Sequence, residues 1–92
     1  MDSLYCVVFE VKAVKQLKEL DRPQRVLLLN WIIDNLDGCE NPYATNGAKK
    51  LENIASGIRY RVGNYRLLAM IHNDLVQITV IMIGHKSQVY GA

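Results

Sequence analysis

Two short turn sequences constrain the fold of this chain more than any other feature. Gly63-Asn64 and Asn73-Asp74 are dipeptides that favour tight hairpin turns, and they separate three segments rich in β-branched and aromatic residues. Segments that are joined by such short turns pair side by side in opposite directions. We therefore predict an antiparallel sheet with three consecutive strands, at residues 58–62, 65–72 and 75–83.

The turn lengths also predict which residues lie opposite one another. With two residues in each turn, Arg61 pairs with Arg66, His72 pairs with Leu75, and Arg66 pairs with Ile81 on its other side. Alternation then gives one apolar face, made of Ile58, Tyr60, Val62, Tyr65, Leu67, Ala69, Ile71, Val76, Ile78, Val80 and Met82. The opposite face carries Arg59, Arg61, Arg66, Leu68, Met70, His72, Gln77, Thr79 and Ile81, and also His85 if the last strand extends that far.

The residues before this sheet predict one strand and two helices. Residues 4–11 are apolar on both faces, which is typical of a central or well-covered strand. Apolar residues then recur at helical spacing over 12–20, and again from an N-cap candidate, Asp21, to about Gly38. The second helix is expected to direct six side chains toward the core: Val26, Leu28, Leu29, Ile32, Ile33 and Leu36.

We predict that residues 1–92 form a single small α+β domain. A two-helix hairpin packs on one face of an antiparallel sheet in the order β-α-α-β-β-β, and a further short strand is possible near 49–52. The longest apolar runs are far shorter than the ~20 residues that span a bilayer, and no basic-then-apolar leader is evident. We therefore expect a cytoplasmic protein that does not bind membranes. Its two cysteines, Cys6 and Cys39, are expected to stay reduced, and their positions do not suggest a metal site.

The net charge of +2 hides an uneven distribution of charged residues. Residues 1–40 carry five basic and seven acidic side chains, whereas residues 41–92 carry six basic and two acidic side chains. A basic half favours a polyanionic partner such as nucleic acid. Ordinary scatter of surface charge would give the same composition, so only the positions of the basic residues can distinguish it from a binding site for a polyanion.

Three arginines gather on the predicted face that points away from the core. Arg59 and Arg61 lie on one strand and Arg66 lies on the next, directly opposite Arg61. Like charges across an antiparallel pair are unfavourable by up to ~1 kcal/mol, and no acidic residue is predicted on this face. A bound anion explains the cluster. The alternative is that the three side chains splay into water and have no function.

Two sequence motifs resemble those of the RelE/ParE toxin superfamily. Residues 59–66, Arg-Tyr-Arg-Val-Gly-Asn-Tyr-Arg, resemble the family pattern R-x-R-V-G-D-Y-R. Residues 83–90, Ile-Gly-His-Lys-Ser-Gln-Val-Tyr, resemble the C-terminal pattern V-G-H-R-x-x-V-Y. Asn41-Pro42 and a Gly-x-x-x-Leu step over 47–51 precede these motifs, so that the resemblance covers nearly the whole chain in the same element order.

The resemblance to the RelE branch implies the toxin of a toxin–antitoxin pair, an endoribonuclease that cuts ribosome-bound mRNA. It implies a reaction without metal or cofactor, in which the RNA 2′-hydroxyl attacks the adjacent phosphate. By position in the motifs, Arg59 and Arg61 help to activate the nucleophile and hold the RNA backbone, and Arg66 stabilises the transition-state charge. Lys86 protonates the leaving 5′-oxygen, and Tyr90 stacks on or orients the substrate.

The sequence leaves open which residue donates the proton and whether two further lysines contact RNA. Lys86 stands where the family usually has arginine, so its role as the acid is assigned by position alone. His85 is the alternative proton carrier, because imidazole changes charge near neutral pH, or else it is a strand-end histidine that bonds to backbone. Lys49 and Lys50 could contact ribosomal RNA or could be solvated surface lysines.

Two other functions are compatible with the resemblance. ParE-like members share the fold but inhibit DNA gyrase, and a homologue that has lost catalysis would serve only as the partner of an antitoxin. Every version implies a cognate antitoxin, through which the complex could also bind operator DNA. Three apolar side chains near the arginines, Leu68, Met70 and Ile81, are expected to attract such a partner.

Overall fold

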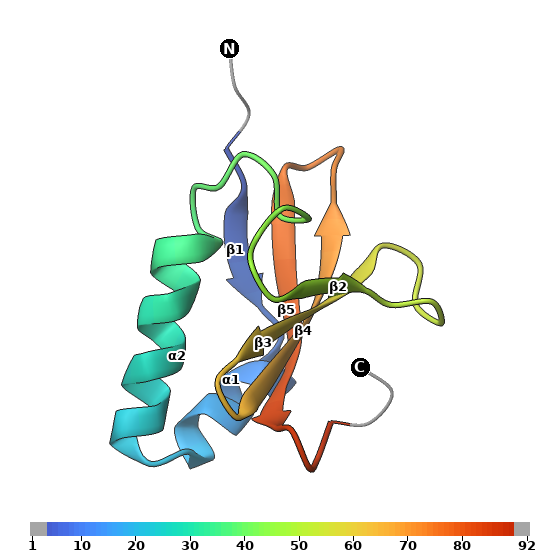
Figure 1. Ribbon diagram of the computed structural model, residues 1–92. Coiled ribbons are helices and arrows are strands. Elements are labelled where there is room, and N and C mark those ends of the chain that lie inside the picture. The colour runs from blue at the N-terminus through green and yellow to red at the C-terminus, as the bar shows by residue number, and fades with distance from the viewer. Residues whose placement is uncertain (1–3, 90–92) are drawn as a thin grey trace.

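A computed structural model describes residues 4–89 of the chain as an α+β domain (Figure 1). Five strands form one sheet in the order β1-β5-β4-β3-β2. The elements follow one another as β1 Cys6–Phe9, α1 Val11–Glu19, α2 Arg22–Asn35, β2 Ala48–Lys50, β3 Gly57–Val62, β4 Tyr65–His72 and β5 Gln77–His85. The predicted fold class and element order are confirmed, including the short strand before β3.

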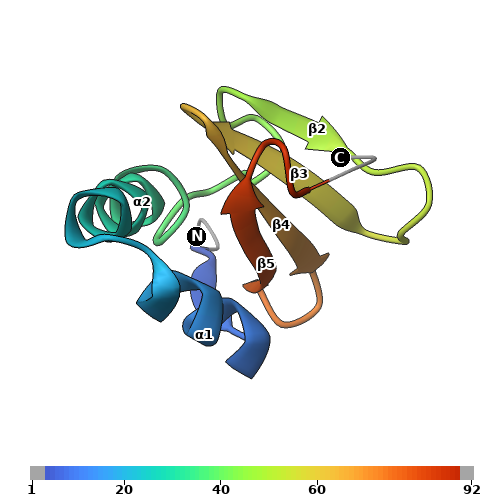
Figure 2. The same ribbon diagram turned by 90° about the horizontal axis from the view of Figure 1, so that it is seen from below.

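Both helices lie on one side of the sheet, and the interior between the layers is apolar (Figure 2). Ala13 and Leu17 of α1 and Leu28 and Ile32 of α2 are buried there. The sheet contributes Ile58, Tyr60, Val62, Leu67, Ala69, Ile71, Ile78, Val80 and Ile83. Within the part of the chain that the structure describes, neither helix is long and apolar enough to cross a membrane.

Two α2 side chains that the sequence places in the core are exposed. Val26 is 43% exposed and Ile33 is 60% exposed, because burial on this helix follows the four-residue spacing of Leu28, Ile32 and Leu36. Val26 and Ile33 are seven residues apart and therefore share another flank of the helix. Ile33 lines an open groove beside β1 instead of the centre of the sheet.

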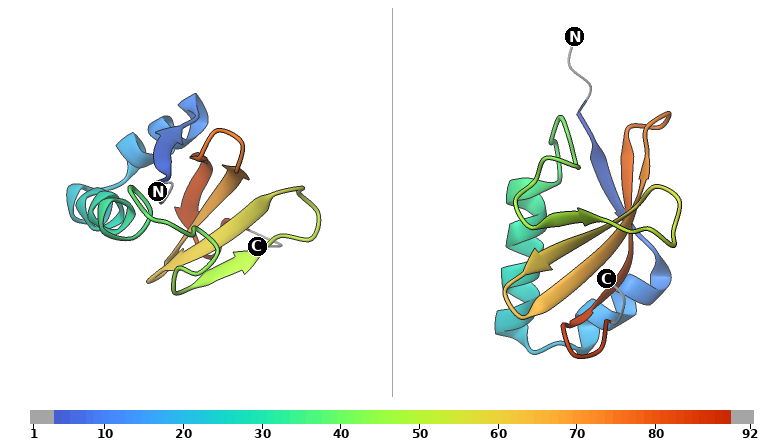
Figure 3. Two further views of the ribbon diagram at one scale, coloured as in Figure 1. Left: turned by 90° about the horizontal axis from the view of Figure 1, so that it is seen from above. Right: turned by 45° about the vertical axis from the view of Figure 1, so that its right-hand side comes forward.

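β1 is an edge strand and not the central strand that its apolar residues suggest. It pairs only with β5, and it runs parallel to it. At its start a turn covers the outer edge, where the Tyr5 N–H donates to the Cys39 carbonyl (2.9 Å) and the Gly38 N–H donates to the Tyr5 carbonyl (2.8 Å). A short strand with its edge partly covered in this way needs no second strand beside it. Figure 3 shows β2 at the opposite edge, next to β3.

The β3–β4 hairpin has the predicted register. Arg61 pairs with Arg66, and Val62 pairs with Tyr65 on either side of the two-residue turn. Gly63 has a φ of +58°, as the first central residue of a type II′ turn requires. The prediction succeeds because the dipeptide itself fixes the turn length.

The β4–β5 hairpin differs from the prediction in its turn. His72 pairs with Gln77, because the loop takes four residues, 73–76, in place of two. Val76 has a φ of +50°, which a β-branched residue rarely adopts. Its carbonyl accepts a hydrogen bond from the backbone N–H at the start of β1 (3.0 Å). A contact with a distant strand thus supports a loop conformation that the local dipeptide does not predict.

A β-bulge shifts the register again in the second half of this hairpin. β5 contains one extra residue, Ile81, opposite the Leu68–Ala69 step of β4. Arg66 consequently lies opposite Gly84 and not opposite Ile81.

The bulge also changes which β5 side chains face the helices. Ile83 is buried in the core, in the place predicted for Met82, whereas Met82 lies opposite Leu68 on the other face. His85 lies opposite Tyr65, which belongs to the helix side of the sheet. The predicted placement of His85 with the arginines is therefore wrong.

Tyr60 links the sheet to α2 and to the loop that follows it. Its side chain is fully buried, its hydroxyl donates to the Pro42 carbonyl at 2.7 Å, and its ring centroid lies 5.6 Å from that of Trp31. The loop that leads to β2 is therefore anchored to the core through one phenol.

Tyr60→Phe is expected to lower the free energy of unfolding by at least ~1 kcal/mol, because it leaves the buried Pro42 carbonyl without its donor. Tyr5→Phe is the matched control, since the Tyr5 hydroxyl donates to Asn73 Oδ1 (2.7 Å) at an exposed site where water can replace it. Chemical denaturation of both variants measures the difference. Equal losses would contradict the anchoring role of Tyr60.

Stability at high pH should also depend on Tyr60. Burial, reinforced by Cys39 and Tyr43, raises the pKa of the Tyr60 hydroxyl above its usual range. A raised pKa in the folded state gives stability that is complete below the unfolded value near ~10 and is lost as the pH rises above it. The unfolding free energy of the parent should therefore fall more steeply above pH ~10 than that of Tyr60→Phe. Parallel pH profiles would contradict this expectation.

Candidate active site

Four basic residues lie together on the face of the sheet that points away from the helices. Lys49 of β2 pairs with Arg59 of β3, and Arg61 of β3 pairs with Arg66 of β4. Arg59 and Arg61 are two residues apart on one strand, so all four share this face. We call this surface the arginine face, defined by Lys49, Arg59, Arg61 and Arg66.

The positive charges of the arginine face lie close enough to repel one another. Burial lowers the pKa of the Arg59 guanidinium, and the charges of Arg66 and Arg61 lower it further. An arginine stays protonated in spite of such a shift, so the repulsion persists at physiological pH. Among the described residues, no Asp or Glu of strands β2 to β5 lies opposite Arg61 or Arg66. An anion that binds here would relieve the repulsion.

Arg66 is held in place by the turn of its own hairpin. Its Nη1 donates to the carbonyls of Gly63 (3.1 Å) and Tyr65 (3.0 Å). The remaining donors of the guanidinium fork stay available for other acceptors. Arg66 therefore stabilises the turn and also presents a fixed positive charge beside Arg61.

The C-terminal motif lies against this hairpin. Gly84 of β5 pairs with Arg66, and the Lys86 N–H donates to the Asn64 carbonyl at 2.7 Å. The Lys86 side chain is exposed at the end of β5. The fold thus brings residues 59–66 and residues 83–89 together.

The segment after β5 turns back over the arginine face (Figure 2). Val89 is 7% exposed, and a Cβ at position 84 would lie 3.0 Å from Val89 Cγ2, so a glycine permits this close packing. Leu68 is also buried on this face, at 8% exposure. Tyr90 follows Val89 directly, but it lies outside the described residues.

His85 lies apart from the arginines and bonds locally. Its Nδ1 accepts a hydrogen bond from the Ser87 N–H (3.2 Å) and lies 2.8 Å from the Ser87 hydroxyl. Its ring meets the Tyr65 ring edge-on, with 5.7 Å between centroids. These contacts match the alternative of a strand-end histidine bonded to backbone, and they order the turn that carries Lys86.

The two neighbouring lysines of β2 have different surroundings. Lys49 lies on the arginine face opposite Arg59, whereas the Lys50 Nζ lies 5.2 Å from the centroid of the Tyr43 ring. A cation–π contact of this kind occupies Lys50 away from the arginines. Lys49 is therefore the one of the pair that could contact an anion bound at the site.

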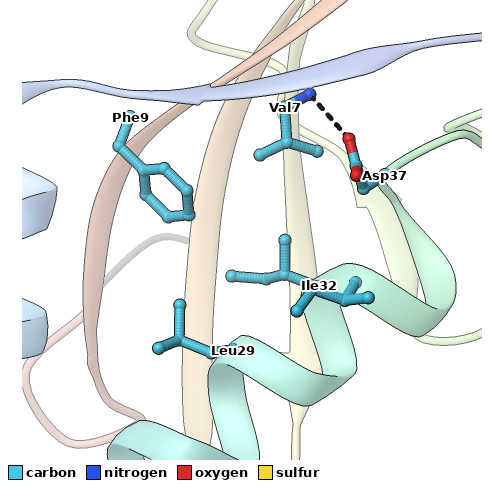
Figure 4. Close-up of a pocket in the computed structure, with 6 residues that line it drawn as sticks. Val7, Phe9, Leu29, Ile32 and Asp37 are labelled. Carbon is cyan, nitrogen blue, oxygen red and sulfur yellow. Dashed lines mark hydrogen bonds between the residues drawn. The ribbon is translucent and has the colours of Figure 1, made fainter.

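The apolar patch predicted beside the arginines is largely covered. Leu68 is buried, and Met70 and Ile81 are half-buried. An open apolar groove of about 240 Å³ lies instead between β1 and α2. Figure 4 shows Phe9 and Val7 of β1 above Leu29 and Ile32 of α2.

Sequence reasoning missed this groove, although two signals pointed to it. Residues 4–11 are apolar on both faces, and α2 carries more apolar residues than one buried stripe needs. Asp37 closes one end of the groove, where its Oδ1 accepts a hydrogen bond from the Val7 N–H at 3.4 Å (Figure 4).

Arg61→Ala should leave the protein more stable than Arg66→Ala does. Both changes remove the Arg61–Arg66 pair, worth up to ~1 kcal/mol, and both relieve the repulsion on Arg59, but Arg66→Ala also removes two hydrogen bonds to the turn. Thermal melting at low ionic strength measures the difference. In ~1 M NaCl, where charges are screened beyond ~3 Å, any gain from Arg61→Ala should vanish. A gain that does not depend on salt would contradict the electrostatic explanation.

Comparison with known proteins agrees with the motifs and with the fold. A family model described as the ParE toxin of the type II toxin–antitoxin system parDE matches residues 7–90. No curated sequence matches the chain.

Several solved structures share the fold at low sequence identity. The RelBE2 toxin–antitoxin complex from Mycobacterium tuberculosis gives a TM-score of 0.75 at 20% identity, over 89% of this chain and 98% of the other. The RelE–RelB complex from Pyrococcus horikoshii gives 0.74 at 20% identity, over 94% and 99% of the two chains. Isolated E. coli RelE gives 0.69 at 22% identity, over 88% and 83%. The chain therefore has a RelE-like fold, and it belongs to the ParE toxin family of type II toxin–antitoxin systems within the RelE/ParE superfamily.

Proposed function

We propose that this toxin is an endoribonuclease that cleaves ribosome-bound mRNA and so inhibits translation. The observation that carries the proposal is the pairing of Arg61 with Arg66, with Arg59 on the same face and the end of β5 beside it. Folding alone gives no reason to place Arg61 directly opposite Arg66, because like charges across an antiparallel pair are unfavourable. Phosphate groups of RNA are anions that guanidinium forks bind well.

The proposed reaction is transesterification at one phosphate of the RNA chain. The 2′-oxygen forms a bond to phosphorus as the bond from phosphorus to the 5′-oxygen breaks. The 2′-hydroxyl loses its proton to solvent, and a proton donor supplies one to the 5′-oxygen. The products are a 2′,3′-cyclic phosphate on one fragment and a 5′-hydroxyl on the other.

Each site residue has a proposed role that follows from its charge and place. Arg59 and Arg61 hold the RNA backbone and favour loss of the proton from the 2′-hydroxyl, although neither is itself a useful base. Arg66, fixed by the turn, stabilises the charge that develops on the phosphate. Lys86 donates the proton to the leaving oxygen, and Tyr90 orients the substrate.

Lys86 is the better candidate for the proton donor than His85. The backbone of Lys86 bonds to the turn that separates Arg61 from Arg66, so its side chain starts at the edge of the arginine face. His85 lies on the helix side of the sheet, and its Nδ1 bonds to Ser87. We propose that His85 contributes by ordering this turn. Lys49 is a further proposed RNA contact, whereas Lys50 lies against Tyr43.

Inhibition of DNA gyrase is the second candidate function. It is favoured by the description of the matching family, which names the ParE toxin. The resemblance assigns gyrase inhibition to ParE-like members, which commonly lack the full set of basic residues and the terminal tyrosine found here. The arginine face is the reason that we place RNA cleavage first.

We also propose a cytoplasmic toxin that is neutralised by a cognate antitoxin, with operator DNA bound through that partner. Structures of similar fold come from complexes of a RelE with a RelB. The groove between β1 and α2 offers an apolar surface for a segment of the antitoxin, because Ile33 is 60% exposed and β1 is an edge strand.

Arg66→Ala should slow single-turnover cleavage of ribosome-bound mRNA by ~10²–10³, because a charge donor at the developing oxyanion is lost. Arg66→Lys should restore part of the rate, since an ammonium keeps the charge but not the planar fork. Arg25→Ala on α2 is a matched control that removes an arginine away from this face. Cleavage by Arg66→Ala at the parental rate would remove Arg66 from the site.

Cleavage should proceed in EDTA once ribosome integrity is secured, and should leave a 2′,3′-cyclic phosphate. The physical reason is that fixed guanidinium groups supply the positive charge at the phosphate. Labelled RNA bound to cross-linked ribosomes, with analysis of the fragment ends, makes the measurement. A strict requirement for Mg²⁺ in the chemical step, or a 3′-hydroxyl product, would contradict the proposed mechanism.

A further inference from the structure

Gln16 makes a long-range contact with the end of β5 that carries the candidate active site. Its Oε1 accepts a hydrogen bond from the Ile83 N–H at 2.7 Å, across 67 residues of sequence. The other polar residues of α1 are exposed, whereas Gln16 is half-buried. This side chain is therefore directed inward, at the backbone of a strand.

The contact lies just beyond the point where β1 stops pairing with β5. β1 pairs with β5 only as far as Phe9 and Val80, and the Glu10 N–H donates the last bond to the Val80 carbonyl (2.9 Å). The chain then leaves the sheet as α1, which contacts β5 (Figure 1). Gln16 thus supplies the acceptor that a longer β1 would have supplied.

The residues directly after Ile83 belong to the candidate active site. Gly84 pairs with Arg66, and Lys86 bonds through its N–H to the Asn64 carbonyl. The bulge at Ile81 interrupts the regular β4–β5 ladder just before them. The end of β5 therefore follows a bulge in its pairing with β4 on one side, and on the other side it is hydrogen-bonded to α1.

We propose that Gln16 is a positioning residue that fixes the end of β5, and with it Lys86, against the β3–β4 hairpin. This inference rests on the proposed function where it concerns cleavage. Without the Gln16 acceptor, the nearly buried Ile83 amide has no partner, and the strand must shift to find one. A misplacement of about 1 Å in an active site can cost ~10²-fold in rate.

The test compares Gln16→Met, which keeps the length of the side chain but has no acceptor, with Gln16→Glu, which keeps an acceptor oxygen. In Gln16→Met we expect hydrogen exchange at the Ile83 and Lys86 amides to accelerate at least ~10-fold, and cleavage of ribosome-bound mRNA to slow by ~10–100-fold. Gln16→Glu should restore both. Lys15→Met is the matched control, because Lys15 is exposed on the same helix.

A double-mutant cycle separates positioning of Lys86 from a general loss of stability. Lys86→Ala should slow cleavage much less in the Gln16→Met background than in the parent, because a displaced Lys86 already contributes less to the cleavage rate. Additive losses would overturn the proposal, and so would rapid exchange at Ile83 with parental protection at Lys86. A parent that does not cleave mRNA would remove the proposed function, while the exchange at Lys86 would still decide whether Gln16 positions this segment.

Discussion

The repulsion between Arg61 and Arg66 is the feature on which the account of this protein depends. The β3–β4 hairpin holds the two guanidinium groups on opposite positions of neighbouring strands, and Arg59 adds a third charge on the same face. The pairing of Arg61 with Arg66 is unfavourable by itself, and a bound anion such as the phosphate of the proposed RNA substrate would relieve it. The buried face of the same strands, packed under the two helices, provides the stability that makes this arrangement tolerable.

The sequence predicts the parts of the site that local turn chemistry controls. Gly63 fixes a two-residue turn, and the pairing of Arg61 with Arg66 follows from that. The other side of the site could not be predicted, because Ile81 forms a bulge and Val76 adopts a positive φ in contact with β1. The conformation of Val76 is supported by its contact with β1, which the local dipeptide does not encode. The longer loop and the bulge together bring Gly84 opposite Arg66, and the bulge by itself moves His85 to the helix side.

Distant contacts also explain why the position of β1 in the sheet was predicted wrongly. β1 reads as a central strand because its residues are apolar on both faces, yet its neighbours are β5 and a turn after α2. The surplus apolar surface lines the groove with Ile33. The arginine face and this groove involve different elements, so a partner could cover the groove without covering the arginine face. Gln16 of α1 links the helices to the end of β5 through its bond to the Ile83 N–H.

Expression of the chain alone in bacteria tests the central claim most directly, with primer extension on a translated reporter mRNA and gel analysis of plasmid supercoiling from the same cells. The arginine face predicts growth arrest with new 5′ ends inside the translated region, while supercoiling stays unchanged. Altered supercoiling with intact transcripts would contradict RNA cleavage and would assign the toxin to gyrase inhibition.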